Sequence, residues 1–170
     1  MYYASVRAKA QKVLDDTGLS GAARVPLSQI AKHLGLSIEY LPCDDGVVEG
    51  ICLSCSGEGL LRVKRRKYRP RLRFTVAHEI GHYVLGHSLD ISFCGLPCPL
   101  SPQETEANVW ASELLMPRAA FQREIQNAGG VASIDNLSSV FGVSRAAAKF
   151  RTIDLYRLGV LSFSQDSRAS

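Results

Sequence analysis

Residues 73–87 read RFTVAHEIGHYVLGH and contain the pattern His78-Glu79-x-x-His82. Two residues four apart on an α-helix differ by about 40° in azimuth and about 6 Å in height, so both imidazoles can face one ion. Histidine nitrogens at this spacing are typical of zinc sites. Glu79 lies roughly 100° round the helix, where it need not be a ligand and can accept a proton from a water molecule. The stretch therefore predicts a helix that carries a metal site and a general base.

The same pattern also occurs by chance, as two ordinary histidines beside a surface glutamate. The surrounding sequence is therefore needed to distinguish a metal site from a chance match. Gly81 suits a helix that packs closely against a neighbour. His87 follows His82 by five residues, which places it about 140° round a continued helix. We therefore interpret His87 as structural or substrate-facing and not as a ligand.

A catalytic zinc usually has three protein ligands and one open position. The acidic candidates for the third ligand are Asp90, Glu104, Glu106 and Glu113. Glu104 shares a helix face with Asn108, four residues later, whereas Glu106 and Glu113 fall on other sides of the same predicted helix. Helical phase therefore favours Glu104, with Glu106 as the alternative. Asn108 is expected to accept a hydrogen bond from the far nitrogen of a ligating histidine.

Two stretches of the chain resemble the ImmA/IrrE family of zinc metallopeptidases. The first is residues 73–87, and the second is ETEANVWASELLMP at residues 104–117. Residues 30–35 and 141–144 are also similar to the family, so the resemblance covers nearly the whole chain. Trp110 and Ser112 stand where the family usually has Phe and Ala. Neither departure removes a catalytic group.

This resemblance implies a zincin-like (thermolysin-like) core and a protein substrate. By position, His78, His82 and Glu104 would be the zinc ligands, and Glu79 the general base. Zinc is the expected ion, with manganese as the alternative. The implied substrate is a transcriptional repressor of the helix-turn-helix (XRE-like) type. Its cleavage would derepress genes of mobile elements, phages or a stress response.

The hydrophobic pattern predicts an α+β fold with a small sheet early and helices after it. We expect a metallopeptidase domain over residues 1–130, with N-terminal helices and a small twisted sheet. A helix-turn-helix-like segment over residues 131–170 is expected to pack on it and to end in a frayed tail. The predicted helices cover residues 3–17, 26–34, 72–87, 103–116 and 118–128, and two more lie within 134–158. The predicted strands cover residues 36–41, 47–55 and 60–64.

Composition and cysteine content indicate the class of protein and its compartment. The chain is 46% hydrophobic and 21% charged, which is typical of globular proteins. No run of about 18 apolar residues occurs, so we expect no membrane span. The N-terminus shows no signal peptide, and an odd number of cysteines favours reduced thiols in the cytoplasm. A four-cysteine structural zinc is disfavoured because Cys52 and Cys55 fall inside a predicted strand.

Two basic regions suggest further partners. Residues 62–73 hold eight Lys or Arg residues, and we expect Arg65 and Arg66, together with His87, to help dock a substrate. The alternative is a solvated hairpin end. In the C-terminal segment Arg145, Lys149 and Arg151 have the spacing of DNA-contacting residues, but their apolar neighbours favour packing. DNA is the less favoured partner. The alternative function is a regulatory DNA- or repressor-binding protein with little or no proteolytic activity.

Overall fold

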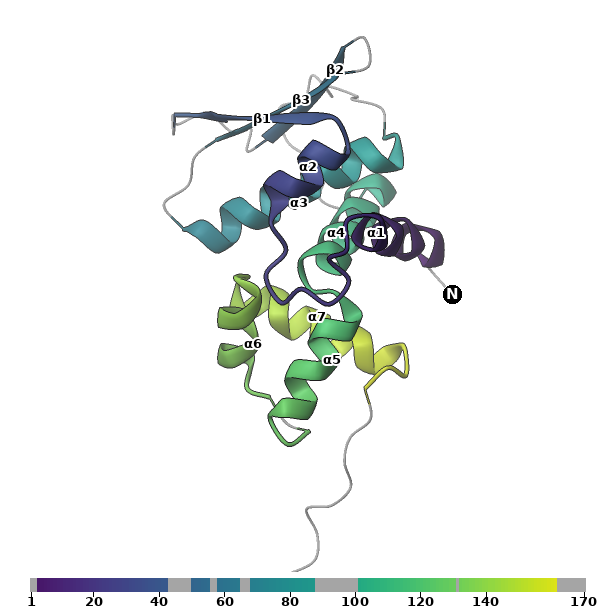
Figure 1. The fold of residues 1–170 in the computed structure, drawn as a ribbon, viewed down its shortest axis with the longest axis vertical. Coiled ribbons are helices and arrows are strands. Elements are labelled where there is room, and N and C mark those ends of the chain that lie inside the picture. The colour runs from purple at the N-terminus through teal and green to yellow at the C-terminus, as the bar shows by residue number, and fades with distance from the viewer. Residues whose placement is uncertain are drawn as a thin grey trace, which may run out of the picture.

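A computed structural model describes residues 3–42, 50–55, 58–64, 68–87, 101–130 and 132–161 (Figure 1). Within these ranges the helices are α1 (Ala4–Asp16), α2 (Leu27–His33), α3 (Arg69–Leu85), α4 (Pro102–Leu115), α5 (Arg118–Asn127), α6 (Ile134–Phe141) and α7 (Arg145–Arg157). The strands are β1 (Leu36–Leu41), β2 (Gly50–Cys55) and β3 (Glu58–Lys64). This order of elements is consistent with the predicted α+β class.

The three strands form one small sheet in the order β1-β3-β2. β1 pairs with β3 in parallel, with Leu36 opposite Gly59, and β2 pairs with β3 antiparallel. Leu61 and Val63 of the central strand are fully buried, so one face of the sheet points into the core. Figure 1 shows the sheet at one end of the molecule, above α2 and α3. The sheet thus supports the helix that carries His78.

Most predicted elements are present with small shifts at their ends. The strand over Leu36–Leu41 has the predicted bounds. Helix α3 begins at Arg69 instead of Leu72, because Pro70 sits in the first turn, where its missing N–H leaves no hydrogen bond unmade. The first residues of the predicted strand over 47–55 lie outside the described residues.

Helix α3 ends at Leu85, before His87, and the reason is Gly86. This glycine has φ 71°, the left-handed conformation that glycine adopts without strain. The backbone N–H of His87 then donates to the carbonyl of His82 at 3.1 Å, which is the closing bond of a Schellman motif. The chain therefore turns back on the helix, and His87 does not continue its spiral.

Helices α3 and α4 approach each other closely at Gly81. A Cβ at this position would lie 3.2 Å from Cε3 of Trp110 and 3.3 Å from the carbonyl oxygen of Ala107. Trp110 is fully buried and fills the space beside the contact. A larger residue at position 81 would push the two helices apart. The close packing that the sequence predicts for Gly81 is thus present, and it fixes how far α4 lies from the histidines of α3.

A buried arginine connects α7 to the C-terminal end of α4. Arg151 is fully buried and donates to the two carboxylate oxygens of Glu113 at 2.7 and 2.6 Å, and to the carbonyl of Met116 at 3.0 Å. Arg7 of α1 also donates to Glu113, and it donates to both oxygens of Asp154 at 2.8 Å. The hypothesis that Arg151 contacts DNA is wrong, because its guanidinium is enclosed and fully paired.

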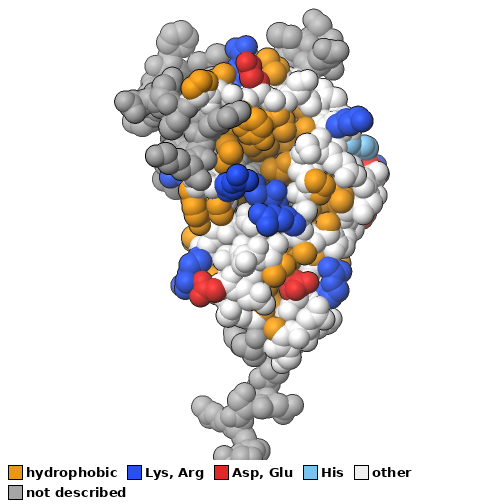
Figure 2. Space-filling view, turned by 60° about the vertical axis from the view of Figure 1, so that its left-hand side comes forward, with side chains coloured by type: hydrophobic (Ala, Val, Ile, Leu, Met, Phe, Trp, Pro, Cys, Tyr) orange, Lys and Arg blue, Asp and Glu red, His pale blue; other side chains and the backbone are white. Residues whose placement is uncertain are grey.

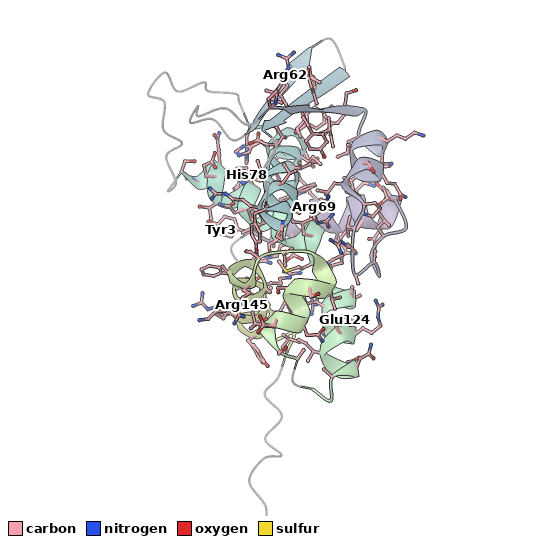
Figure 3. All side chains as sticks on the ribbon, turned by 90° about the vertical axis from the view of Figure 1, so that its left-hand side faces the viewer. Tyr3, Arg62, Arg69, His78, Glu124 and Arg145 are labelled. Carbon is pink, nitrogen blue, oxygen red and sulfur yellow. The ribbon has the colours of Figure 1, made fainter. Side chains whose placement is uncertain are left out.

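The C-terminal helices lie at the end of the molecule opposite the sheet. Figure 3 shows Arg145 of α7 and Glu124 of α5 in this part, away from Arg62 on the sheet. The predicted boundary at residue 130 falls between α5 and α6, and the division into two domains stays a prediction. No helix in the described part of the chain is long and apolar enough to cross a membrane.

Candidate metal centre

Three side chains from α3 and α4 converge at one point. The Nε2 atoms of His78 and His82 are 3.0 Å apart, and the Glu104 carboxylate lies 3.1 Å from the first and 3.3 Å from the second. Tetrahedral ligands at 2.0–2.1 Å from a zinc ion lie about 3.3 Å from one another. The spacing therefore fits a single ion. These three residues are the group in the described part of the chain that could hold a metal.

Glu104 reaches the histidines from the first turn of α4. Ser101 caps this helix, and its hydroxyl accepts the backbone N–H of Glu104 at 3.1 Å. Ser101-x-x-Glu104 is the sequence of a capping box, in which the glutamate would return to the cap. Here the carboxylate instead faces His78 and His82. The cap thus fixes the backbone of Glu104 and leaves its side chain for the site.

The two histidines are neutral near pH 7. Burial lowers the pKa of His78, and burial together with the neighbouring His78 lowers the pKa of His82 to about 4. The Glu104 charge acts in the opposite direction on both rings but does not outweigh burial. A neutral imidazole has a free lone pair, which is the form that binds a metal ion.

Asn108 lies where helical phase places it, one turn after Glu104. Its Oδ1 is 3.0 Å from Nδ1 of His78. Because an amide oxygen only accepts, Nδ1 carries the proton and Nε2 keeps its lone pair toward the site. Figure 3 shows His78 within the part of the molecule that lies under the sheet.

His87 contacts both α3 and α4, which helical periodicity does not predict. Its Nδ1 lies 3.0 Å from Nδ1 of His82, and its Nε2 lies 3.0 Å from Oε2 of Glu106. The His87 side chain is 7% exposed, so little of it is available to a substrate. Of the two interpretations left open for His87, these contacts favour the structural one. The glycine at position 86, which ends the helix, is the signal that could have revealed the contact.

Glu79 lies on α3 beside the converging side chains. Burial, together with the nearby charge of Glu104, raises the pKa of its carboxyl to about 7. No described side chain donates a hydrogen bond to it. A carboxyl with a pKa near neutrality can both accept and release a proton under physiological conditions.

The two arginines predicted to dock a substrate, Arg65 and Arg66, lie outside the described residues. Arg62, in the same basic stretch of the sequence, donates to Glu39 at 2.7 Å, so this cation already has a partner on β1. On the face shown in Figure 2, the described Lys and Arg side chains form separate groups and not one continuous stripe. This face therefore gives no support for a track that follows a nucleic-acid backbone.

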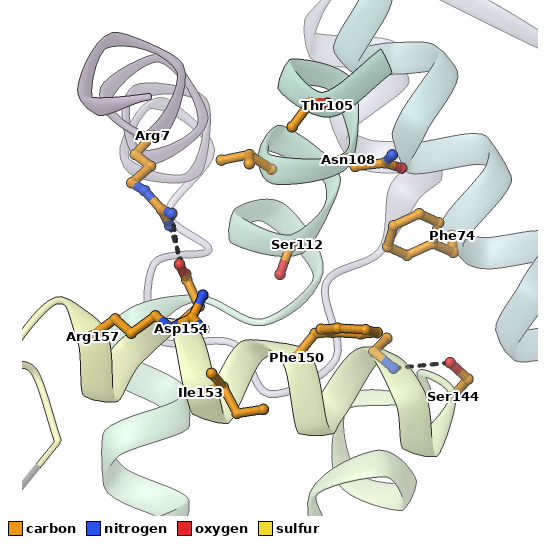
Figure 4. A pocket seen from close by; sticks show the side chains of 12 residues that line it. Arg7, Phe74, Thr105, Asn108, Ser112, Ser144, Phe150, Ile153, Asp154 and Arg157 are labelled. Carbon is orange, nitrogen blue, oxygen red and sulfur yellow. Dashed lines mark hydrogen bonds and ion pairs between the residues drawn. The ribbon is translucent and has the colours of Figure 1, made fainter. Parts of the chain in front are cut away.

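A cavity of about 650 Å³ lies between α4 and α7, and Asn108 is among the residues that line it (Figure 4). Phe74, Val109 and Phe150 supply much of its apolar wall. Phe150 is 73% exposed, which is unusual for a large apolar side chain. None of the three converging residues lines the cavity, and Asn108 connects the two because it lines the cavity and also contacts His78.

Two histidines and a glutamate that could hold one metal ion, with a nearby carboxyl of near-neutral pKa, resemble the metal centres found in hydrolases. Residues 31–152 match the IrrE N-terminal-like domain, the M78 peptidase family. The match covers most of the chain, and the chain belongs to this family. A metallopeptidase-like or IrrE-type regulatory protein is the class that this membership supports.

Among solved structures, the chain is similar to a Mycobacterium tuberculosis transcriptional regulator, with 19% sequence identity and a TM-score of 0.56. The similarity covers 97% of this chain and 49% of that protein, so the chain spans about half its length. At this identity the likeness concerns the fold alone. A comparison with curated proteins found no match.

Proposed function

We propose that the chain is a zinc-dependent endopeptidase with a zincin-like core. The observation that carries this proposal is the convergence of His78, His82 and Glu104 at distances that suit one ion. Family membership supports the peptidase class. The proposed substrate is a repressor of the helix-turn-helix (XRE-like) type, whose loss would derepress genes of mobile elements, phages or a stress response. This part rests on the resemblance of the two motifs.

The chain's own residues account for binding and proton transfer. When bound by the three ligands, zinc would polarise a peptide carbonyl and lower the pKa of a water molecule. Glu79 accepts the proton of the attacking water and delivers it to the leaving amine. Asn108 holds the His78 ring in the orientation that the site needs.

Zinc is the ion that we propose, and manganese is the alternative. Two imidazole nitrogens and one carboxylate oxygen are a ligand set that suits zinc, whereas manganese is more often held by oxygen-rich sites. Zinc content of the purified protein, measured by mass spectrometry of metals, should approach one ion per chain. Manganese at that stoichiometry, with zinc absent, would reverse this assignment.

We propose that the substrate chain passes from the metal into the cavity between α4 and α7. The shared residue is Asn108, which contacts His78 on one side and lines the cavity on the other. Phe74 precedes His78 by one helical turn, so it extends the cavity wall toward the metal. An apolar wall of this size suits an aliphatic or aromatic side chain. In this proposal the C-terminal segment serves the peptidase domain, because α7 supplies one wall.

The test uses a helix-turn-helix repressor encoded beside the chain. Incubation with the zinc-loaded protein should give fragments that a chelator suppresses. Glu79→Gln should abolish cleavage while it keeps zinc, because glutamine fills the same volume but cannot accept the proton. Glu124→Gln, on the distant helix α5, is the matched control and should cleave normally. A repressor that stays intact with zinc supplied would overturn the peptidase proposal.

The alternative function is binding of DNA or of a repressor without proteolysis. Of the three α7 cations with the spacing of DNA-contacting residues, Arg145 and Lys149 are exposed, and Arg145 already pairs with Asp135. Specific DNA binding by the zinc-loaded chain, with no fragment formed, would favour this alternative. The buried position of Arg151 removes one of the three cations on which it rested.

A further inference from the structure

The two ligand histidines have different partners at their far nitrogens. Nδ1 of His78 faces the amide oxygen of Asn108, which can only accept a hydrogen bond. Nδ1 of His82 faces Nδ1 of His87, a ring nitrogen that can either donate or accept. His87 alone therefore leaves two arrangements open for His82. In one of them the proton of His82 sits on Nε2 and blocks the atom that would bind the metal.

Glu106 decides between the two arrangements. Its Oε2 lies 3.0 Å from Nε2 of His87, and an ionised carboxylate can only accept. Nε2 of His87 must then carry the proton, so the Nδ1 atom of a neutral His87 has a free lone pair. That lone pair accepts the Nδ1 proton of His82. The Nε2 atom of His82 is left unprotonated, and it is the atom that faces Glu104.

We propose that His87 and Glu106 are positioning residues that fix the tautomer of His82 and thereby prepare it to bind the metal. This inference rests on the proposed metal centre and deepens it. In this arrangement His82 donates to His87, and His87 donates to Glu106. Glu106 lies two residues after the proposed ligand Glu104. A partner at the far nitrogen of a ligating histidine commonly changes metal affinity by about 10- to 100-fold.

The backbone supplies the geometry for this relay. A continued helix would carry His87 about 140° away from His82. Gly86, at φ 71°, ends the helix and lets the N–H of His87 bond to the His82 carbonyl, so that both rings meet. Helix α4 presents Glu106 from the other side. The relay thus joins the end of α3 to the first half of α4.

A merely structural link between α3 and α4 would hold the helices without setting a tautomer, and the first experiment separates the two roles. The chain has four histidines, and long-range ¹H–¹⁵N correlation spectra of the zinc-free protein report the tautomer of each. We expect His82 to be protonated at Nδ1 in the wild type. In Glu106→Gln the amide can donate to His87, which reverses the relay. A substantial share of His82 should then carry its proton on Nε2.

The second experiment measures zinc affinity by competition with a chromogenic chelator. We expect Glu106→Gln to bind zinc about 10-fold more weakly, and His87→Phe to be affected at least as strongly, because phenylalanine fills the space without an acceptor. His87→Asn should restore affinity, since its Oδ1 can take the place of the ring Nδ1 and accept from His82. Glu124→Gln on α5 should match the wild type.

The outcomes distinguish this inference from the proposed function. If Glu106→Gln and His87→Phe leave both the His82 tautomer and zinc affinity unchanged, the relay is overturned. The Glu106 side chain is 37% exposed, so its substitution tests the relay even if His87→Phe fails to fold. If the wild type binds no zinc, the proposed function fails. The spectra of the zinc-free protein then still decide whether the relay exists.

Discussion

The two ends of helix α4 carry glutamates that meet basic partners, yet the two glutamates do different things. Glu104, in the first turn, faces two imidazoles, and its side chain is 27% exposed. Glu113, in the last turn, is held by Arg7 and by the fully buried Arg151. A guanidinium is always charged, so it neutralises its carboxylate completely. Two neutral imidazoles do not, and they leave the charge of Glu104 available to a metal cation.

The difference shows that the partner, and not the residue type, decides what a glutamate does in this fold. The first half of α4 collects groups with free lone pairs, which can share an ion. The second half collects fixed charges that cancel, which can only hold helices together. We expect substitutions at the first end to change chemistry and those at the second end to change stability.

The largest effect should come from Glu104→Gln. It removes the charged ligand but keeps the volume, so we expect zinc to be lost and repressor cleavage to fall at least about 10³-fold, equivalent to about 4 kcal/mol of activation free energy. The free energy of unfolding of the zinc-free protein should change little, because the carboxylate has no permanent cation as partner. Metal analysis and urea unfolding check both parts. Full zinc content with normal cleavage would contradict the assignment of Glu104.

Glu113→Gln should show the opposite behaviour. It removes the carboxylate that binds both sides of the buried Arg151 guanidinium and leaves only Asp154, at 3.2 Å and shared with Arg7, as its countercharge, which costs about 3 kcal/mol of folding free energy. Zinc content per folded molecule should stay at the wild-type value. Asp135→Asn is the control, because it breaks the exposed pair with Arg145 and should cost less than about 1 kcal/mol. Equal destabilisation by the two variants would remove the distinction between the buried and the exposed pair.

A third glutamate, Glu79, has neither an imidazole nor a guanidinium partner among the described residues. We therefore expect the free energy of unfolding to depend on pH through its carboxyl. Its pKa is raised from 4.5 to about 7 by burial, so the folded chain holds this proton more tightly than the unfolded chain. That stabilisation is present in full below about pH 4.5 and is lost as pH rises to about 7. The loss is on the order of 3 kcal/mol.

Urea unfolding of the zinc-free protein between pH 5 and about 8 measures this effect. The Glu79→Gln variant should lack this fall in stability, because glutamine does not titrate. If the wild type and the variant give parallel curves across this range, Glu79 is already ionised at low pH in the folded chain.

The smallest effect should come from Phe150→Ala, which touches neither end of α4 but lines the cavity beside Asn108. We expect the KM for repressor cleavage to rise about 3- to 10-fold with kcat unchanged, as lost apolar contact of about 1 kcal/mol predicts. The fold should tolerate the change, since Phe150 is 73% exposed. Tyr68→Ala, at another exposed aromatic, is the control. An unchanged KM would mean that the substrate does not use the cavity.

Periodicity predicted the parts of the site that lie on one helix. The spacing of His78 and His82 placed both rings together, and the phase of Glu104 and Asn108 placed them on the same face of α4. Such arguments depend only on helix geometry, so they need no knowledge of the rest of the fold. The described helices and strands follow the predicted pattern for the same reason.

Contacts between elements were harder to predict. The predicted helix continued through Gly86, so His87 was expected on a face away from His82. Gly86 instead has a left-handed φ that ends the helix, and hydrophobic periodicity contains no information about this φ. Arg151 meets Glu113 across 38 residues of sequence, and its spacing on α7 resembles that of a DNA-contacting cation. Only the packing of α7 on α4 shows that it is buried.

Helix α4 is fixed at its start by the Ser101 cap, at its middle by the close contact with Gly81 and at its end by Arg151. None of these contacts involves the converging side chains of His78, His82 and Glu104. The free energy of metal binding is therefore not needed to order the helix, in contrast to zinc fingers, in which binding and folding are one event. We therefore expect the chain to release an ion from the proposed centre and to take it up again while it stays folded. Under the proposed function, metal supply would then set the active fraction without changing how much folded protein is present.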